Sequence, residues 1–292
     1  MKRILLFVFT NLAIMVTLMI VLSLLGVTGY ITPDGLNYSA LMVFSLVWGF
    51  GGAFISLAMS RWMAKMAMGV QLVDGRTGQG ELDWLYQTVE QLSRKAGLPM
   101  PEVGVYDSPE VNAFATGPSK RRSLVAVSSG LLRSMRHEEI EGVLAHEVSH
   151  IQNGDMVTMT LIQGVVNAFS IFFSRVIANI VRQMVDERIS HLVFFVTTIV
   201  FDIVFSILGM MVVAWFSRAR EFRADAGAAT LSSRGNMIAA LQRLMANKAL
   251  VDTSQPQLAT MKIHGAKGKG FLALISTHPP LEARIDALQR LQ

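Results

Sequence analysis

The sequence predicts an α-helical membrane protein that has four transmembrane helices and a water-soluble α+β portion. Of its 292 residues, 52% are hydrophobic and 16% are charged, whereas soluble domains carry about 25% charged residues. The apolar residues gather into four long blocks that are almost free of charge, and the segments between them contain turn residues and short alternating runs. This composition excludes a disordered or collagen-like chain.

Residues 1–60 are predicted to form the first two transmembrane helices. The first apolar block, residues 4–25, would be about 33 Å long as a helix, which is enough to cross a hydrocarbon core of roughly 30 Å. It is also longer than the apolar core of a cleaved signal peptide. Basic residues precede the first block (Lys2) and follow the second (Arg61), so the positive-inside rule places the N-terminus and the chain after the second helix in the cytoplasm.

Residues 61–155 are predicted to form one half of the cytoplasmic, water-soluble portion. Residues 81–95 have helical periodicity. Three short segments have the alternation of strands and are separated by turn residues: 102–106, 111–116 and 123–128. The basic run 120–122 falls in a predicted turn, and the net charge of +5 comes mostly from residues beside the apolar blocks, so no nucleic-acid partner is expected.

Residues 156–216 are predicted to form a transmembrane hairpin that crosses the membrane and returns. Asp202 lies inside its second helix, about 15 Å from the outer end, whereas Arg175 ends the first apolar block and is expected to extend to the interface. Pairing of the two would need the helices to tilt. Asp202 is therefore either a functional carboxylate or a hydrogen-bonding group in helix packing.

Residues 217–292 are predicted to return to the cytoplasm. They contain a helix around 236–247, a loop over 251–270 and a short terminal helix over 281–291. Whether that loop covers a functional site is left open.

A metal-binding pattern stands in the first cytoplasmic half, where residues 146–150 read His-Glu-Val-Ser-His. The surrounding apolar residues have helical periodicity, so His146 and His150 lie one turn apart on the same face. In the H-E-x-x-H pattern the two histidines bind zinc and the glutamate, here Glu147, is the general base of a metalloprotease. Because the chain has 0 cysteines, any third ligand must be His, Asp or Glu.

Glu221 is the best candidate for the third ligand that catalytic zinc requires. Asp225 lies one helical turn later and could accept a hydrogen bond from the second nitrogen of a ligand imidazole. Because two predicted spans separate His150 from Glu221, both would lie on the cytoplasmic side. A surface helix with interspersed charges, such as Arg220 and Arg223, is the alternative that these residues leave open.

These features together resemble the HtpX-type membrane zinc metallopeptidases, a family related to the CAAX prenyl endopeptidases. The resemblance extends over the whole chain, including two spans before the zinc motif and two after it. It implies a zincin-like fold for the soluble portion and one Zn²⁺ per subunit, bound by His146, His150 and Glu221. The motifs that carry it are Asn-Ala-Phe-Ala-Thr-Gly at 112–117, His-Glu-Val-Ser-His to Asn-Gly-Asp at 146–155, Glu-Phe-Arg-Ala-Asp at 221–225, and Thr-His-Pro-Pro with a following Arg-Ile at 277–285.

The resemblance also implies roles for individual residues. Glu147 would take a proton from zinc-bound water and pass it to the leaving amine, with a pKa raised by its apolar surroundings. Asp225 would orient His146. His278 would donate a hydrogen bond to the tetrahedral intermediate, with support from Arg284. Without the resemblance, the local sequence indicates only a histidine in a loop.

Asn112, Ala113, Phe114 and Ala115 begin a predicted strand whose side chains alternate between two faces. In the resembled family this strand is the edge strand of the active site, to which an extended substrate adds as another strand. An ordinary core strand is the alternative.

By the same resemblance the protein would be a metalloendopeptidase that cleaves misfolded or damaged membrane and cytoplasmic-side proteins, as part of envelope quality control and the stress response. Its partners would be polypeptide substrates, the lipid bilayer and other membrane quality-control proteases, and it would lie in the bacterial inner membrane with its N-terminus and active site in the cytoplasm. A CAAX-type processing peptidase and a non-catalytic scaffold or transporter are the alternatives. An intramembrane protease is excluded, because the charged residues within 136–141 would be too costly in hydrocarbon.

Overall fold

The computed structural model describes residues 2–27, 29–32, 35–254 and 274–291. The chain divides into two compact units, each made of two separate stretches. We call them the helical unit, which comprises Met1–Leu57 and Thr158–Val213, and the sheet unit, which comprises Ala58–Val157 and Ala214–Gln292.

The helical unit is built from apolar helices, three of which are long and apolar enough to cross a membrane. In α1 the apolar stretch with described side chains, Asn11–Leu24, is shorter than a span, so the count of four transmembrane helices stays a prediction. A two-stranded antiparallel ribbon of β1 and β2 lies between α1 and α2. The bounds are α1 Lys2–Leu24, β1 Ile31–Thr32, β2 Gly35–Leu36, α2 Tyr38–Met68, α6 Asp155–Arg182 and α7 Glu187–Leu231, and the last three helices continue into the sheet unit.

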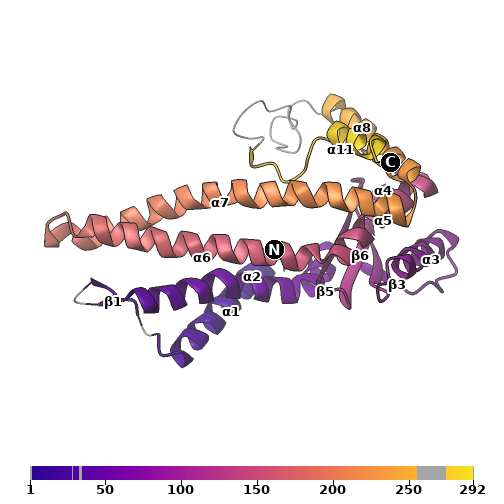
Figure 1. The fold of residues 1–292 in the computed structure, drawn as a ribbon. Coiled ribbons are helices and arrows are strands. Elements are labelled where there is room, and N and C mark those ends of the chain that lie inside the picture. Colours follow the sequence, from indigo (N-terminus) through magenta and orange to yellow (C-terminus); the bar gives the residue numbers. More distant parts are fainter. Residues whose placement is uncertain (1, 28, 33–34, 255–273, 292) are drawn as a thin grey trace. The chain divides into compact units, whose positions relative to one another are not determined.

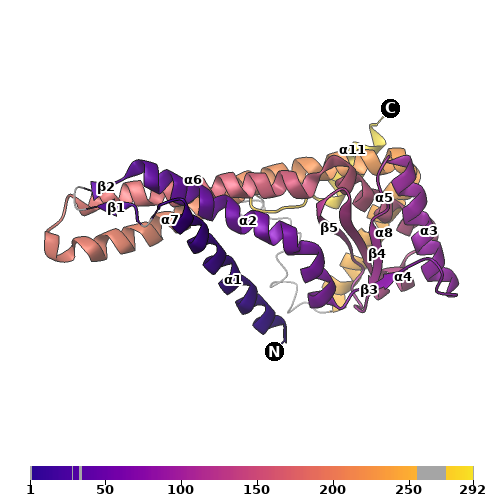
Figure 2. The same cartoon turned by 90° about the horizontal axis from the view of Figure 1, so that it is seen from below.

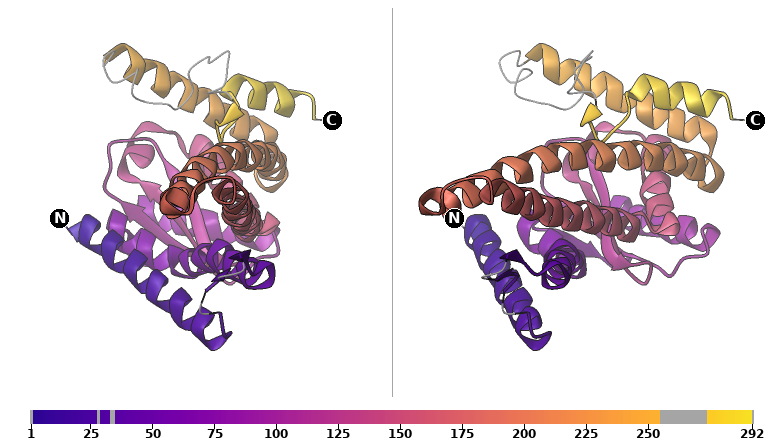
Figure 3. Two further views of the ribbon diagram at one scale, coloured as in Figure 1. Left: turned by 90° about the vertical axis from the view of Figure 1, so that its left-hand side faces the viewer. Right: turned by 60° about the vertical axis from the view of Figure 1, so that its left-hand side comes forward.

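Helices α6 and α7 run antiparallel and side by side within the helical unit (Figures 1 and 3). Small residues permit the close approach, since a Cβ on Gly209 would lie 2.2 Å from a methyl group of Val166. Arg175 Nη1 lies 3.1 Å from Asp202 Oδ1. The pairing that was expected only with tilted helices is therefore present: α6 continues to Arg182, so Arg175 lies inside the helix, within reach of Asp202.

The sheet unit contains a four-stranded sheet with the strand order β3-β4-β6-β5. The parallel pair β4 and β6 forms its centre, and β3 and β5 add to it in antiparallel orientation at the two edges. The segment predicted at 102–106 is β4, whereas β3 was not predicted because three residues are too few to show alternation. The strand bounds are β3 Gln71–Val73, β4 Glu102–Tyr106, β5 Ala113–Ser119 and β6 Arg122–Ser128.

Helices α3, α5 and α8 contribute to the core of the sheet unit (Figure 2). On α5 the fully buried Ile140, Leu144, Val148 and Ile151 form one apolar face. Helix α8 continues to Ser254, so the first residues of the loop expected over 251–270 are helical, and 255–270 lie outside the described residues. The remaining bounds are α3 Gly80–Lys95, α4 Ser129–Ser134, α5 His137–Asn153, α8 Arg234–Ser254 and α11 Leu281–Gln289.

Candidate metal centre

Helix α5 presents the two histidines of the predicted motif from its C-terminal half. His146 and His150 are both buried, one turn apart. The helix ends at Gly154, whose φ of 69° is left-handed and favours glycine. Helix α6 then begins at the next residue, Asp155. The chain therefore turns sharply just beyond the second histidine.

Helix α7 brings Glu221 to these histidines by crossing α5 closely. A Cβ on Gly227 would lie 2.1 Å from Ser149 Oγ and 3.0 Å from its Cβ, so only glycine allows this approach without a shift. Glu221 and Asp225 are 1% and 2% exposed. The buried carboxylates therefore need partners that offset the loss of hydration.

The ligand atoms of the three predicted ligands converge on one point. His146 Nε2 and His150 Nε2 are 3.0 Å apart, and the two carboxylate oxygens of Glu221 each lie 3.5 Å from one of these nitrogens. Ligands held at 2.0–2.1 Å in a tetrahedral site would be about 3.3 Å apart. Glu221 Oε1 is buried and has no hydrogen-bond partner among the described residues, so the donor set fits a metal ion.

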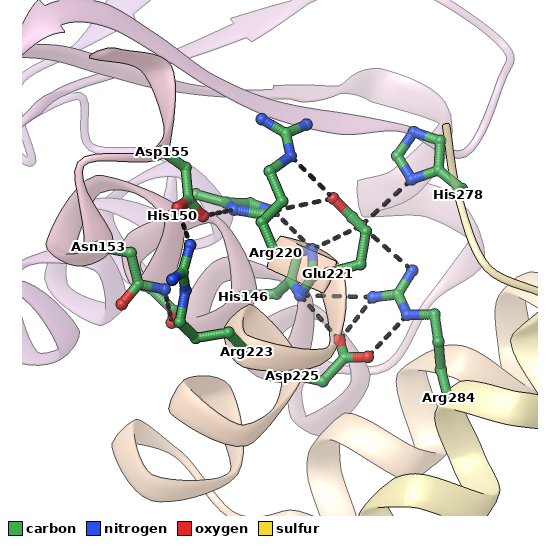
Figure 4. Close-up of polar contacts among 11 residues, drawn as sticks. His146, His150, Asn153, Asp155, Arg220, Glu221, Arg223, Asp225, His278 and Arg284 are labelled. Carbon is green, nitrogen blue, oxygen red and sulfur yellow. Dashed lines mark hydrogen bonds and ion pairs between the residues drawn. The ribbon is translucent and has the colours of Figure 1, made fainter. Parts of the chain in front are cut away.

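The second nitrogen of His146 is held by a carboxylate, as Figure 4 shows. Nδ1 lies 2.9 Å from Asp225 Oδ1, and Arg284 donates to both Asp225 oxygens, from Nε at 2.7 Å and from Nη2 at 2.5 Å. A proton on Nδ1 leaves Nε2 as the metal-facing lone pair. Asp225 and Arg284 thus fix the ring of His146.

His150 has a corresponding pair of partners, which sequence reasoning missed as site residues. Its Nδ1 lies 2.6 Å from Asp155 Oδ2, and Arg223 Nη2 donates to Asp155 Oδ1 at 2.9 Å. Asp155 was noted only as part of a motif and Arg223 as a surface charge. The available signal was an aspartate placed directly after the glycine that ends the histidine helix.

The charges of this cluster stabilise one another. Burial alone would lower the pKa of His146, but its hydrogen bonds to Asp225 and Glu221 raise that pKa to about 9. Burial would raise the pKa of Glu221, but bonds to His146 and His278 hold it well below its usual range. Asp225 follows the same pattern, since Arg284 and His146 lower its pKa against the effect of burial. Both carboxylates lie in the sheet-unit part of α7, beyond its apolar stretch.

His278 and Glu147 complete the set of predicted catalytic residues. His278 Nδ1 lies 3.2 Å from Glu221 Oε2, with a side chain that is 56% exposed. Arg284 was expected to support His278, but in the described structure its contacts are with Asp225, Glu221 and His146. Glu147, between the two histidines on α5, is half-buried.

The predicted substrate strand is β5, which packs beside α5. Ala113, Phe114 and Ala115 pair with Val127, Ala126 and Val125 of β6. Asn112 directly precedes β5, and its backbone N–H donates to Ser128 Oγ at 3.1 Å. Because β5 is the last strand in its sheet, its other side is an edge within the described structure.

Comparison with known proteins decides the family. A model of peptidase family M48 matches residues 80–292. The chain belongs to peptidase family M48. Membership in family M48 makes the protein a metallopeptidase, a hydrolase of peptide bonds. Its apolar helices make it a membrane protein.

Relatives within family M48 match along the whole chain. Protease HtpX of Thioalkalivibrio sulfidiphilus is 52% identical over 298 residues and covers 100% of both chains. The protease HtpX homolog of Bacillus subtilis is 53% identical over 297 residues and covers 99% of each. The resemblance to the HtpX-type family is therefore confirmed.

The fold is shared with a more distant solved structure. The crystal structure of S. mikatae Ste24p superposes with a TM-score of 0.61 at 18% identity, and the match covers 99% of this chain. The chain spans 66% of the length of that structure. At this level of identity the likeness concerns the fold alone.

Proposed function

We propose that the protein is a membrane-anchored zinc metalloendopeptidase that cleaves misfolded or damaged membrane and cytoplasmic-side proteins. The convergence of His146, His150 and Glu221 carries the proposal, because two imidazoles and a carboxylate whose Oε1 has no hydrogen-bond partner among the described residues form the ligand set of a hydrolytic zinc site. Family membership supports a peptidase activity. The relatives named protease HtpX support a protease over a scaffold or transporter.

The proposed mechanism assigns a separate task to each residue near the metal ligands. A bound zinc ion supplies a Lewis acid that lowers the pKa of a water molecule and polarises the scissile carbonyl. Glu147 accepts the proton of the attacking water and returns it to the leaving amine nitrogen. His278, exposed beside Glu221, donates a hydrogen bond to the oxygen on which negative charge develops.

The substrate backbone is proposed to bind along β5. An extended peptide placed at this edge can hydrogen-bond to the backbone of Ala113 and Ala115 as a further antiparallel or parallel strand. Asn112 and Phe114 lie at the same end of the strand. This arrangement holds the peptide beside α5, where Glu147 and the metal ligands lie.

The membrane arrangement is part of the same proposal. Residues 1–60 and 156–216 would be transmembrane, with 61–155 and 217–292 in the cytoplasm of a bacterium and the helices in its inner membrane. Three helices of sufficient length and apolarity support this arrangement, as do the basic residues that flank the first two apolar blocks.

Two substitutions test the mechanism in full-length protein purified in detergent. Glu147→Gln should retain zinc but lose cleavage of a casein-type substrate, by about 100-fold or more, because it removes the base and leaves the ligands. Glu221→Ala should lose bound zinc, as measured by metal analysis. Glu90→Gln, which alters an exposed ion pair with Arg94, is the control for both measurements. Wild-type turnover in Glu147→Gln would refute the assigned base, and a full zinc content in Glu221→Ala would refute the third ligand.

A further inference from the structure

The two metal-ligand histidines each have the same kind of hydrogen-bond partners. Each imidazole meets an aspartate at its Nδ1, and each aspartate in turn accepts from an arginine. For His146 the aspartate comes from α7, one helical turn after the third ligand, and the arginine comes from α11. For His150 they are Asp155 and Arg223, which stand in two of the motifs described above but were given no role of their own. Figure 4 shows both sets around the convergence point.

The position of Asp155 depends on the turn that separates α5 from α6. On one uninterrupted helix, a residue five positions after His150 would point away from the ring. The left-handed conformation of Gly154 redirects the chain after the helix, and Asp155 then reaches back to place Oδ2 2.6 Å from His150 Nδ1. A Cβ at Gly154 would meet nothing within 4 Å, so the glycine is needed for its backbone angle and not for space.

The contacts of Asp155 account for both of its oxygens. The residue is 1% exposed, so an ionised carboxylate here requires partners. Oδ2 meets the imidazole, and Oδ1 accepts from Arg223 Nη2 at 2.9 Å. Arg223 is 58% exposed, which leaves its charge hydrated while it fixes the orientation of the buried carboxylate.

We infer that Asp155, oriented by Arg223, is a positioning residue for His150. Asp155 holds the proton of the imidazole on Nδ1, so Nε2 keeps its lone pair and its direction toward the metal. This inference rests on the proposed metal site. It adds that the site depends on the first residue of α6 as well as on α5 and α7.

A competing interpretation gives Asp155 a purely structural role as an acidic residue in the first turn of α6, where it would interact favourably with the helix dipole. Asp155→Asn separates the two. Loss of the charge removes the interaction with the helix dipole, which lowers stability slightly, but a purely structural role predicts no change in metal affinity. Only the positioning role predicts weaker metal binding, because asparagine lacks the charge that stabilises the Nδ1–H tautomer and that pairs with Arg223.

The experiment uses the full-length protein in detergent, with Co²⁺ and Zn²⁺ as probes. Asp155→Asn should raise the dissociation constant of Zn²⁺ in a chelator competition by roughly 10–100-fold, and should shift the visible absorption bands of bound Co²⁺. Arg223→Gln should weaken binding in the same direction but less. The thermal unfolding midpoint of the metal-free protein is measured alongside, because Arg223→Gln leaves a buried carboxylate without its arginine and should lower that midpoint.

Glu139 and Arg136 provide matched controls at the other end of α5, since a 6% exposed carboxylate there pairs with a 75% exposed arginine. Glu139→Gln and Arg136→Gln should leave metal affinity and the Co²⁺ spectrum as in the wild type.

Unchanged affinity and spectrum in Asp155→Asn, with metal lost from Glu221→Ala, would overturn the inference and leave the proposed metal site intact. If Asp155→Asn does not fold, Arg223→Gln decides in its place: weaker Zn²⁺ binding supports the inference and unchanged binding refutes it. A wild type that binds neither metal would overturn the proposed function itself.

Discussion

Arg284 is the residue that ties the charges of the metal centre together. It is 7% exposed and donates two hydrogen bonds to Asp225, and its Nη1 lies 3.6 Å from Glu221 Oε2. A planar guanidinium can make these contacts at once, which a lysine ammonium cannot. At the residue scale, the buried carboxylates of α7 therefore depend on a cation contributed by α11.

Removal of this cation should destabilise the fold. Arg284→Met leaves the Asp225 carboxylate buried without its arginine and with His146 as its remaining partner, and breaking a buried ion pair in this way costs about 3–5 kcal/mol. The midpoint of denaturant unfolding, followed by circular dichroism in detergent, would measure the loss. Arg94→Met, which removes a 76% exposed arginine, should change it by less than about 1 kcal/mol. Equal unfolding midpoints for the two variants would show that the buried ion pair contributes nothing to the stability of the fold.

At the scale of elements, close helix contacts at glycine set the geometry of the sheet unit. A Cβ on Gly142 of α5 would lie 2.6 Å from the backbone oxygen of Asn236 on α8. Backbone cannot move aside as a flexible side chain can, so α5 and α8 have to separate if a side chain is added. The same helix α5 carries the metal-ligand histidines, and its packing therefore affects their position.

Gly142→Ala should lower stability by about 1–3 kcal/mol, the usual cost of overpacking, despite the better helix propensity of alanine. Gly235→Ala in α8 is the matched control, because its Cβ would make only an ordinary contact of 3.8 Å. Thermal unfolding of both variants gives the comparison. The close-contact argument fails if Gly142→Ala is as stable as Gly235→Ala.

The loop before α3 predicts a pH dependence outside the metal centre. Asp83 accepts from the backbone N–H of Thr77 at 2.8 Å and from its hydroxyl at 2.9 Å, and these bonds lower the pKa of Asp83. Because a depressed carboxyl pKa favours the folded state, this contribution is present above the unfolded pKa of about 3.9 and is lost as pH falls through the folded value. The difference in unfolding midpoint between wild type and Asp83→Asn should therefore be larger at pH 7 than near pH 3. A constant difference would contradict this.

At the scale of the whole molecule, the candidate metal ligands come from stretches on either side of the helical unit's second segment, Thr158–Val213. An ion bound by His146, His150 and Glu221 would cross-link these stretches within the sheet unit. It would bind the folded state and not the unfolded chain, and so stabilise the fold.

Metal removal should accordingly lower the unfolding temperature. At a free metal concentration 100 times the dissociation constant, the loss on chelation would be about 2.7 kcal/mol. Differential scanning fluorimetry with and without chelator measures it, and re-addition of Zn²⁺ should restore the wild-type value. In Glu221→Ala the chelator should have no effect. A chelator-induced shift of equal size in that variant would place the stabilising ion elsewhere.

Local patterns predicted most of the elements and the three candidate ligands, but not the contacts that depend on tertiary geometry. The alternation of side chains gives the bounds of β4. Helical periodicity followed by a glycine gives the end of α5 at Gly154. The pairing of Arg175 with Asp202 was expected only with tilted helices, because the apolar block ends before the helix does. Asp155 was missed because its contact with His150 arises only after the chain reverses at Gly154. The place of Arg284 against Asp225 needed the packing of α11, which has no local signature.

The split origin of the ligands has a consequence for biosynthesis. Ribosomes add residues in order, so a nascent chain that already displays both imidazoles still lacks the glutamate. At typical elongation rates the interval between His150 and Glu221 lasts roughly 4–14 s, during which the intervening hydrophobic hairpin is made. An incomplete chain would consequently be unable to hydrolyse the proteins around it. Hydrolytic activity would arise only in molecules in which the whole hairpin and Glu221 have been synthesised.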